Sequence, residues 1–423
     1  MNVDWVRGDA TGLSFPAHPG AFAVAGPAFL TEAFHCYGML DRGNRVTAVD
    51  RFEVVGGGST GRKAVLTVRY AQPAPHTDLF VKFSRDFDDP VRDVGRTQME
   101  SEVRFARLAC APGFPIAVPA TQFADYHRES GTGLLISQRI PFGEQGIERQ
   151  YHKCLDYEMP APREHYRALL TAVARLAGTE RAGRLPADLA AGSPVDLQAA
   201  TVGERAALRP DQLARRLGRL AEFVERHPGL FSENIRAAGF LAGVTAQAPA
   251  LLRRESDIWR HLADAVDYLA LCHWNANVDN AWFWRTADGK LRCGLMDWGC
   301  VSRMNVAMAI WGSLSGAETA LWDDDLDDLL AMFCEEVSRS GGPALDAAVL
   351  ERHLVLYATL MGVSWLLDVP ALIRKRLPDA GPHTTRYDPR IKDDEGVRAP
   401  LQMLTNVLNL WETRGGTTVL ANL

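Results

Sequence analysis

The hydrophobic pattern of the chain changes at Pro141-Phe142-Gly143. Before this tripeptide, apolar residues alternate over short stretches, which is typical of half-buried strands. After it they recur at i, i+3, i+4 and i+7, the spacing that places them on one face of a helix. The sequence therefore predicts an α+β fold, with an antiparallel sheet and one helix in residues 1–140 and a mainly helical part in residues 141–423.

The first part carries several strand-like stretches and one helix-like stretch. The strand-like ones are rich in β-branched and aromatic residues and are bounded by Gly or Pro. A glycine-rich turn, Gly56–Gly61, follows the first of them, whereas residues 1 to about 45 show no strong period. The predicted strands are 46–55, 63–70, 79–83, 119–126 and 133–140, and the predicted helix is 97–109.

The second part is predicted to be helical. Apolar residues recur at helical spacing from Arg163 to Ala177, and Gly178 is interpreted as the helix stop. A second apolar stripe runs from Ile258 to Leu269, ahead of a polar loop. Further helices are predicted at 323–339, 350–367 and 400–411, and a long surface loop, rich in Pro, Gly and charged residues, at 374–398.

Composition narrows the classes of protein. Hydrophobic residues make up 47 % of the 423 residues and charged residues 23 %, as in soluble globular proteins. The net charge of −6 argues against a nucleic-acid partner, which would normally require a basic excess. The seven cysteines show no CxxC or zinc-type spacing, so we expect reduced thiols in a cytoplasmic protein.

We expect no membrane partner. The N-terminus has no basic region ahead of its apolar stretch, which argues against a signal peptide. The most apolar later run, Leu354–Leu367, is shorter than the ~20 residues that a membrane span needs. A buried helix is predicted there instead.

Residues suited to chemistry are concentrated between positions 271 and 299, which read LCHWNANVDNAWFWRTADGKLRCGLMDWG. An irregular polar loop, His273–Asn280, is followed by two strand-like stretches around the turn Asp288-Gly289. This is the pattern of a β-hairpin. Because a hairpin brings its two ends together, Asn280 and Asp297 are predicted to lie side by side.

An amide oxygen beside a carboxylate suits Mg²⁺. This ion typically takes one or two protein oxygens and completes its shell with substrate phosphates and water. Kinases hold the metal that bridges nucleotide phosphates in this way. The sequence therefore predicts Asn280 and Asp297 as metal ligands.

The segment resembles the catalytic and metal-binding segments of the aminoglycoside phosphotransferase and choline kinase family, whose fold is a two-lobed protein-kinase-like one. The family's loop reads His-x-Asp-x-x-x-x-Asn and is followed by a hairpin and Asp-aromatic-Gly, which His273, Asn280 and Asp297-Trp298-Gly299 match. The resemblance implies an ATP- or GTP- and Mg²⁺-dependent phosphotransferase that acts on a hydroxyl of a small molecule. Residues 1–140 would be its nucleotide-binding N-lobe, and residues 141–423 its C-lobe with the catalytic loop, metal site and substrate-capping helices.

The resemblance also implies a nucleotide site in the first part of the chain. Lys82, in the third predicted strand, resembles the lysine that holds the α- and β-phosphates. Glu102 resembles the ion-pair partner of that lysine, with Glu100 as the alternative. Gln138 lies in a segment similar to the strand and hinge that meet the adenine.

Two interpretations of the glycine-rich turn stay open. It is not spaced as a Walker loop. It is either an ordinary turn or a cover over the phosphates, in which case Gly57, Gly58 and Ser59 are the residues expected to contact the nucleotide.

The loop departs from the family at position 275, where Asn replaces the aspartate that receives the substrate's proton. An amide is not a base at neutral pH, yet positioning and charge neutralisation supply most of the rate of phosphoryl transfer. Asn275 is expected to orient the hydroxyl, Asp279 is the candidate replacement carboxylate, and His273 is expected to hydrogen-bond the loop backbone. No acid occurs in Cys300–Leu314, where the family often has one that braces the loop.

Two functions are therefore compatible with the sequence. One is a working small-molecule kinase, and the other is a nucleotide-binding pseudokinase that senses or scaffolds. Release of ADP in the presence of a hydroxylated substrate distinguishes them. The sequence names neither the acceptor nor the oligomeric state: amino sugars, amino alcohols, sugars, nucleosides and lipid-like alcohols all fit.

Overall fold

The computed structural model describes residues 3–58, 60–186 and 208–415. These residues form two compact units. The first contains the chain up to Gln145 together with Leu295–Val301. The second contains Gly146–Arg184 and most of the later described residues.

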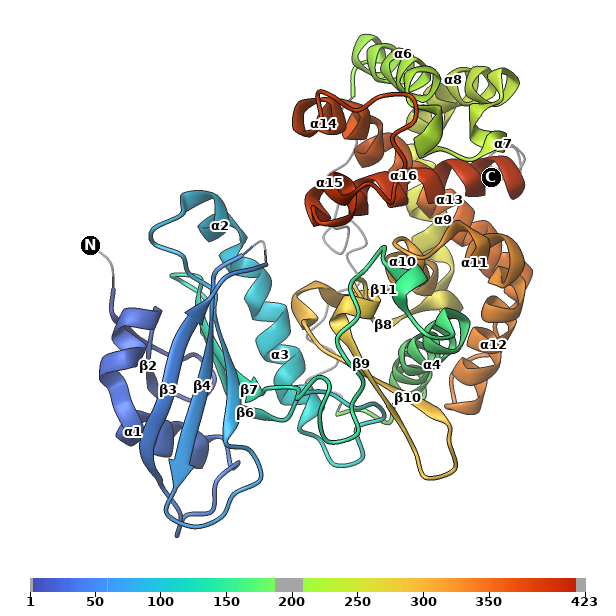
Figure 1. The fold of residues 1–423 in the computed structure, drawn as a ribbon. Helices are drawn as coiled ribbons and strands as arrows, with labels where there is room; N and C mark the ends of the chain where they lie inside the picture. Colours follow the sequence, from blue (N-terminus) through green and yellow to red (C-terminus); the bar gives the residue numbers. More distant parts are fainter. Residues whose placement is uncertain (1–2, 59, 187–207, 416–423) are drawn as a thin grey trace. The chain divides into compact units, whose positions relative to one another are not determined.

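The first unit is built on a five-stranded antiparallel sheet in the order β3-β4-β5-β7-β6 (Figure 1). The five strands were all predicted, with ends within two residues of those observed. They are β3 (Val46–Val55), β4 (Arg62–Tyr70), β5 (Asp78–Phe83), β6 (Thr121–His127) and β7 (Thr132–Gln138).

Helices cover both faces of this sheet (Figure 1). Helix α1 (Pro19–Cys36) packs on one face, where its Phe22 and Phe34 join buried strand residues in one core cluster. Helix α3 (Met99–Ala109) packs on the other face through residues such as Val103. Because successive strand residues point to opposite faces, Phe123 and Leu134 join the first cluster whereas their neighbours Ala124 and Leu135 join the second.

Helix α1 was not predicted from the sequence. Gly26 has a φ of 65° inside it and Pro27 follows, so a kink interrupts the apolar period. The predicted helix 97–109 corresponds to α3, preceded by a 3-10 turn over Gly95–Gln98. The smaller elements of this unit are β1 (Trp5–Arg7), β2 (Ser14–Pro16) and α2 (Pro90–Val94).

The second unit is mainly helical, as predicted. Helix α4 (Pro162–Arg181) packs against α12 (Leu326–Arg339). Helices α10 (Val306–Leu314) and α16 (Glu395–Thr413) both pack against the buried α13 (Ala347–Trp365). The other helices are α6 (Pro210–Arg226), α7 (Glu233–Arg236), α8 (Ala238–Arg253), α9 (Glu255–Asp264), α11 (Thr319–Asp324), α14 (Val369–Arg376) and α15 (Pro389–Lys392).

Two pairs of short strands lie among these helices. Strand β8 pairs with β11, and β9 pairs with β10. The strands are β8 (Leu269–His273), β9 (Ala281–Arg285), β10 (Leu291–Leu295) and β11 (Val301–Asn305). The antiparallel sheet in the first unit and the mainly helical second unit confirm the predicted α+β class.

Three predictions for this unit were wrong in detail. Gly178 does not end its helix: α4 continues to Arg181, and a Cβ on Gly178 would lie 2.4 Å from the carbonyl oxygen of Val337, so glycine allows α4 and α12 to approach closely. The stripe 258–269 is not one helix, because α9 ends at Asp264 and Leu269 begins β8. The predicted loop 374–398 contains α15 and the start of α16.

Two findings bear on the cysteines and on membranes. All seven cysteines are free thiols. Ala347–Arg376 is long and apolar enough to cross a membrane by length and composition, but 72 % of its most apolar window is buried inside the protein. It includes the predicted buried helix, α13.

Candidate active site

Lys82 lies in β5, where strand alternation sets the direction of each side chain. Leu79, Val81 and Phe83 are buried in the core cluster that includes α1. The residues between them therefore face the opposite side of the sheet, which α3 covers. Lys82 accordingly points toward Glu102 of α3.

The ammonium group of Lys82 is shared by two carboxylates. Its Nζ atom lies 2.6 Å from Glu102 Oε1 and 2.6 Å from Asp297 Oδ1. The side chains of Lys82 and Glu102 are 13 % and 8 % exposed. Burial lowers the pKa of Lys82, but attraction to Asp297 and Glu102 outweighs it, and the net effect raises this pKa well above its ordinary value. Lys82 is therefore a fixed positive charge.

Asp297 is held by the residues that follow it. Its φ of 65° lies in the left-handed region, which is uncommon for an aspartate. The Trp298 ring stacks on Phe105 of α3 with 3.7 Å between ring centroids. The Trp298 backbone N–H donates to Glu102 Oε1 at 3.2 Å. One helix thus positions both carboxylates that bind Lys82.

The glycine-rich turn between β3 and β4 is anchored by an arginine. Gly57 and Gly58 have φ values of 105° and 71°, which residues with a Cβ rarely adopt. Arg92 of α2 donates through Nη2 to the carbonyl oxygens of Gly57 at 3.1 Å and Gly61 at 2.8 Å. Ser59, the third residue predicted in this turn, lies outside the described residues.

Lys63 of β4 is a second cation beside this turn. It is the cross-strand partner of Lys82, so the two side chains leave the sheet on the same face. A Cβ placed on Gly58 would lie 1.9 Å from Lys63 Nζ. Burial lowers the pKa of Lys63, and the nearby Asp297 opposes this in part. Within the described residues, Lys63 Nζ has no hydrogen bond.

Glu100, the alternative partner, does not pair with Lys82. Its Oε1 atom lies 2.7 Å from Arg128 Nη2 and 3.4 Å from Arg104 Nη2. Glu100 and Glu102 are two positions apart on a helix, so they face different directions. Of the two candidates, Glu102 is therefore the one that α3 directs toward Lys82.

Gln138 is the last residue of β7. It lies opposite Leu79 of β5 in the sheet register. Its side-chain oxygen accepts from the Ala120 backbone N–H at 3.4 Å. Gln138 therefore stands at the end of the strand next to the one that carries Lys82.

The loop predicted to be catalytic begins at the end of β8. His273 is fully buried, and its Nδ1 atom accepts from the Asn275 backbone N–H at 3.2 Å. The Trp274 indole N–H donates to the Tyr357 hydroxyl at 2.7 Å. Gly312 of α10 lies so close that a Cβ there would be 1.6 Å from the Trp274 carbonyl oxygen. Packing against α10 and Tyr357 therefore braces this loop.

Asparagine side chains order the loop from within. Asn277 Nδ2 donates to Asn275 Oδ1 at 2.6 Å, and Asn280 Nδ2 donates to the Asn275 carbonyl oxygen at 2.9 Å. Because this bond uses the amide nitrogen of Asn280, its side-chain oxygen is the end that can meet a cation. Asn275 Oδ1 accepts one hydrogen bond and keeps a second lone pair.

Asp279, the candidate replacement carboxylate, faces a lysine. Its Oδ2 atom lies 3.3 Å from Lys153 Nζ, and Lys153 also lies 3.0 Å from Glu395. The Asp279 side chain is 18 % exposed. Burial raises the pKa of Asp279, and attraction to Lys153 opposes the rise. The carboxylate is thus already engaged in an ion pair.

Strands β9 and β10 form the predicted hairpin. Its turn is closed by hydrogen bonds from Thr286 N to Lys290 O at 3.0 Å and from Gly289 N to Thr286 O at 2.8 Å. Asn280 immediately precedes β9, and Asp297 comes two residues after β10. The two predicted metal ligands therefore flank the hairpin along the chain, and their convergence on one ion stays a prediction.

The donor set fits a magnesium ion held mainly by phosphates. Among the described residues, no group of three or more His, Cys, Asp or Glu could hold a metal ion. A nucleotide-bound Mg²⁺ needs no such group, because phosphate oxygens and water complete its coordination. The Asp297 carboxylate is 43 % exposed and is a hard oxygen donor of the kind this ion prefers.

Similarity to known proteins is found only among solved structures. No protein-family model and no curated protein sequence matches the chain. The microcompartment-associated aminopropanol kinase is 14 % identical, with a TM-score of 0.43, over 92 % of this chain and 99 % of that one. The Plasmodium vivax ethanolamine kinase is 13 % identical, with a TM-score of 0.42, over 87 % and 83 %.

A third structure is the GDP complex of an aminoglycoside 2′-phosphotransferase-IIIa mutant. It is 16 % identical, with a TM-score of 0.42, over 85 % of this chain and 93 % of that one. All three are named as kinases or phosphotransferases.

Proposed function

We propose that this protein transfers a phosphoryl group from ATP or GTP, with Mg²⁺, to a hydroxyl group of a small molecule. The observation that carries the proposal is the Lys82 ammonium bound by both Glu102 and Asp297 at 2.6 Å. Kinases require a strand lysine paired with a helix glutamate, and an aspartate that holds the metal. Here one unit of the fold supplies this whole set.

The nucleotide phosphates are proposed to bind beside β4 and β5. Glu102 orients Lys82, whose fixed charge favours the α- and β-phosphates. Lys63 adds a second charge next to the turn formed by Gly57 and Gly58, which supports the interpretation of this turn as a phosphate cover. Mg²⁺, when bound, would neutralise phosphate charge, with Asn280 and Asp297 as its proposed ligands.

The acceptor hydroxyl is proposed to be oriented by Asn275. Its Oδ1 atom keeps one lone pair for the hydroxyl hydrogen, while His273 and Asn277 hold the residue in place. Since an amide does not take up the proton, transfer proceeds without the general base that contributes about 10²–10⁴-fold in typical enzymes. Asp279 stands in the same loop as the proposed source of negative charge.

The alternative is a nucleotide-binding pseudokinase. It is favoured by the same residue, because Asn275 replaces the base and its oxygen already accepts a hydrogen bond from Asn277. The two functions share nucleotide binding and differ in turnover. Release of ADP with a hydroxylated acceptor therefore decides between them.

The test combines calorimetry and an ADP-release assay with pooled alcohols. We expect ATP to bind in the presence of Mg²⁺ and ADP to be released with at least one pool. Lys82→Met should abolish both. Lys290→Met should change neither, because Lys290 is 70 % exposed in the hairpin turn and its ion pair with Asp288 is also exposed. Absence of nucleotide binding in the unmodified protein contradicts the proposal, and binding without turnover selects the pseudokinase.

A further inference from the structure

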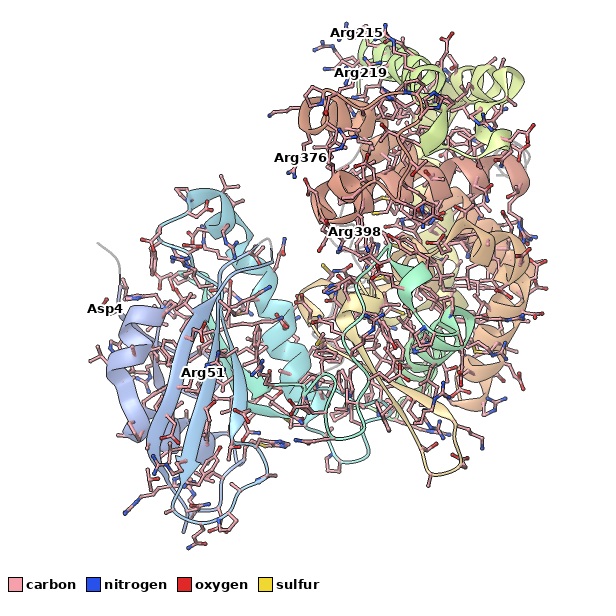
Figure 2. The ribbon with its side chains drawn as sticks, in the orientation of Figure 1. Asp4, Arg51, Arg215, Arg219, Arg376 and Arg398 are labelled. Atoms are coloured by element: carbon pink, nitrogen blue, oxygen red, sulfur yellow. The ribbon has the colours of Figure 1, made fainter. Side chains whose placement is uncertain are left out.

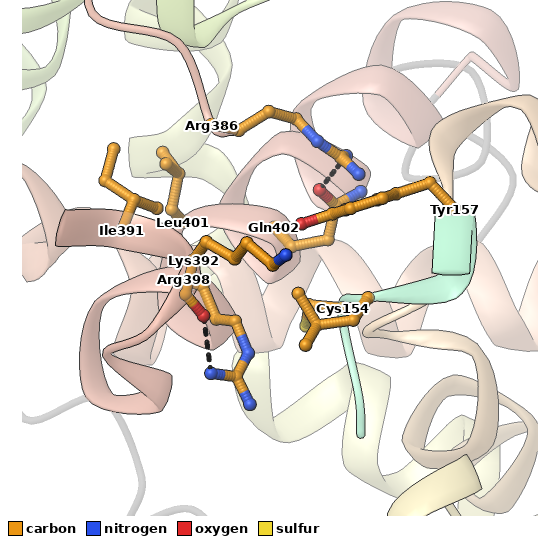
Figure 3. Close-up of a pocket in the computed structure, with 9 residues that line it drawn as sticks. Cys154, Tyr157, Arg386, Ile391, Lys392, Arg398, Leu401 and Gln402 are labelled. Atoms are coloured by element: carbon orange, nitrogen blue, oxygen red, sulfur yellow. Dashed lines mark hydrogen bonds between the residues drawn. The ribbon is translucent and has the colours of Figure 1, made fainter. Parts of the chain in front are cut away.

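A small pocket in the second unit is lined by positively charged residues. It lies between the segment ahead of α4, the residues around α15 and the start of α16, and it is partly open to solvent. Arg386, Lys392 and Arg398 line it together with Tyr157 and Gln402. Figure 3 shows these side chains around the pocket, with Cys154 beside them. No carboxylate is among the described residues that line it.

Two of the three lining cations are held by ion pairs. Lys392 lies 2.5 Å from Glu158, and both side chains are more than a third exposed. Arg386 bonds Glu318 and Gln402. These carboxylates do not line the pocket. The ion pairs therefore fix the two cations without filling the space between them.

Arg398, near the start of α16 (Figure 2), is the most buried of the three, with 10 % of its side chain exposed. It is positioned by two carbonyl oxygens, those of Lys153 at 3.2 Å and Lys392 at 2.8 Å. Among the described residues its nearest carboxylate is Glu395, at 3.8 Å. Its positive charge is thus less neutralised than that of Arg386 or Lys392, and an oxyanion is the group that would compensate it best.

The pocket adjoins the loop predicted to be catalytic. A Cβ on Gly316 would lie 3.1 Å from Cys154 Sγ, a lining residue, and 3.7 Å from Asn277 Oδ1. Asn277 in turn donates to Asn275. Lys153, next to Cys154 in the chain, bonds Asp279 of the same loop. The segment that lines the pocket at Cys154 therefore neighbours the loop that carries Asn275.

We propose that this pocket binds an oxyanion, a phosphate or a carboxylate, carried by the acceptor whose hydroxyl is presented to the Asn275 loop. The inference rests on the proposed phosphotransferase function and names its substrate class as a hydroxylated anion. Three cations without a lining carboxylate disfavour an amino alcohol or amino sugar at this position. A purely structural role for the same ion pairs predicts no affinity for anions.

The binding test uses inorganic phosphate, titrated by calorimetry into the full chain saturated with ADP and Mg²⁺. Lys392→Met should weaken phosphate binding about tenfold, the value of one charge-assisted hydrogen bond. Lys290→Met is the matched control, because that lysine also pairs with one exposed carboxylate, at 2.8 Å, and should leave phosphate binding unchanged. Equal phosphate affinity of the unmodified protein and Lys392→Met overturns the inference.

The turnover test compares ADP release with four acceptor pools: sugar phosphates, hydroxycarboxylates, neutral sugars and amino alcohols. We expect one of the two anionic pools to be preferred, and which one identifies the oxyanion. Preference for a neutral or amino pool overturns the inference and leaves phosphotransfer intact. Absence of nucleotide binding overturns the proposed function, and the inference fails with it.

Discussion

Replacing Lys82 by methionine removes the cation shared by Glu102 and Asp297. Glu102 is 8 % exposed and would be left as a buried charge, which typically costs 3–5 kcal/mol when the partner of a buried pair is removed. Glu102 would still accept the hydrogen bond from Trp298 N at 3.2 Å, which stabilises its charge in part. We therefore expect the free energy of unfolding to fall by about 3 kcal/mol, the lower end of this range. Asp297 adds little, because its carboxylate is 43 % exposed and gains water instead.

A second substitution separates stability from function. In Lys82→Met/Glu102→Gln the buried charge is gone, so most of the lost stability should return, whereas nucleotide binding should not. Urea unfolding followed by circular dichroism measures the first quantity, and calorimetric titration with ATP and Mg²⁺ measures the second. The reasoning is refuted if Lys82→Met is as stable as the unmodified protein, or if the double variant regains affinity for ATP.

Three further predictions follow from single residues. Lys63→Met should weaken binding of ATP about tenfold and leave binding of adenosine unchanged, because Lys63 is proposed to contact the phosphates and not the nucleoside. Calorimetry with both ligands checks this, and equal losses of affinity for ATP and adenosine would contradict it. Asn275→Asp should raise the rate of ADP release by roughly 10²-fold or more, since it restores a base that still accepts from Asn277; an unchanged rate would remove position 275 from the rate-limiting step. Burial raises the pKa of Asp156 from 3.8 to about 7, so this group makes the protein less stable as pH rises from about 4 to about 7 and adds no further change above that. Thermal melts should show that Asp156→Asn is more stable than the unmodified protein at pH 8 but not at pH 4. Equal gains in stability at both pH values would contradict the raised pKa.

The sheet could be predicted from the sequence because its strands show the period of two directly. Helix α1 could not, since a kink at Gly26 and Pro27 divides an apolar stretch into pieces too short to show a helical period. Strand β8 continues the apolar stripe of the preceding helix, so periodicity alone did not separate them. In the predicted loop 374–398, Ile391 is fully buried, which a segment rich in charge and proline does not indicate.

Candidate site residues that belong to a sequence motif were predicted, whereas one whose position depends on strand register was missed. His273, Asn280 and Asp297 were named from their spacing, and their roles stay predictions. Lys63 was missed, because its place beside Lys82 follows from the pairing of β4 with β5, and pairing depends on the length and shape of the turn between them. The cations of the pocket come from segments more than two hundred residues from Tyr157, and no local pattern joins them.

The proposed phosphotransfer requires Asn280 and Asp297 to bind one divalent cation together with a nucleotide. Binding of Mn²⁺ in the presence of ADP, followed by electron paramagnetic resonance, measures this for the unmodified protein, Asn280→Ala, Asp297→Asn and the exposed control Asp288→Asn. We predict that both site variants lose the nucleotide-dependent Mn²⁺ signal and that the control retains it. A signal that survives either site substitution contradicts the shared metal site.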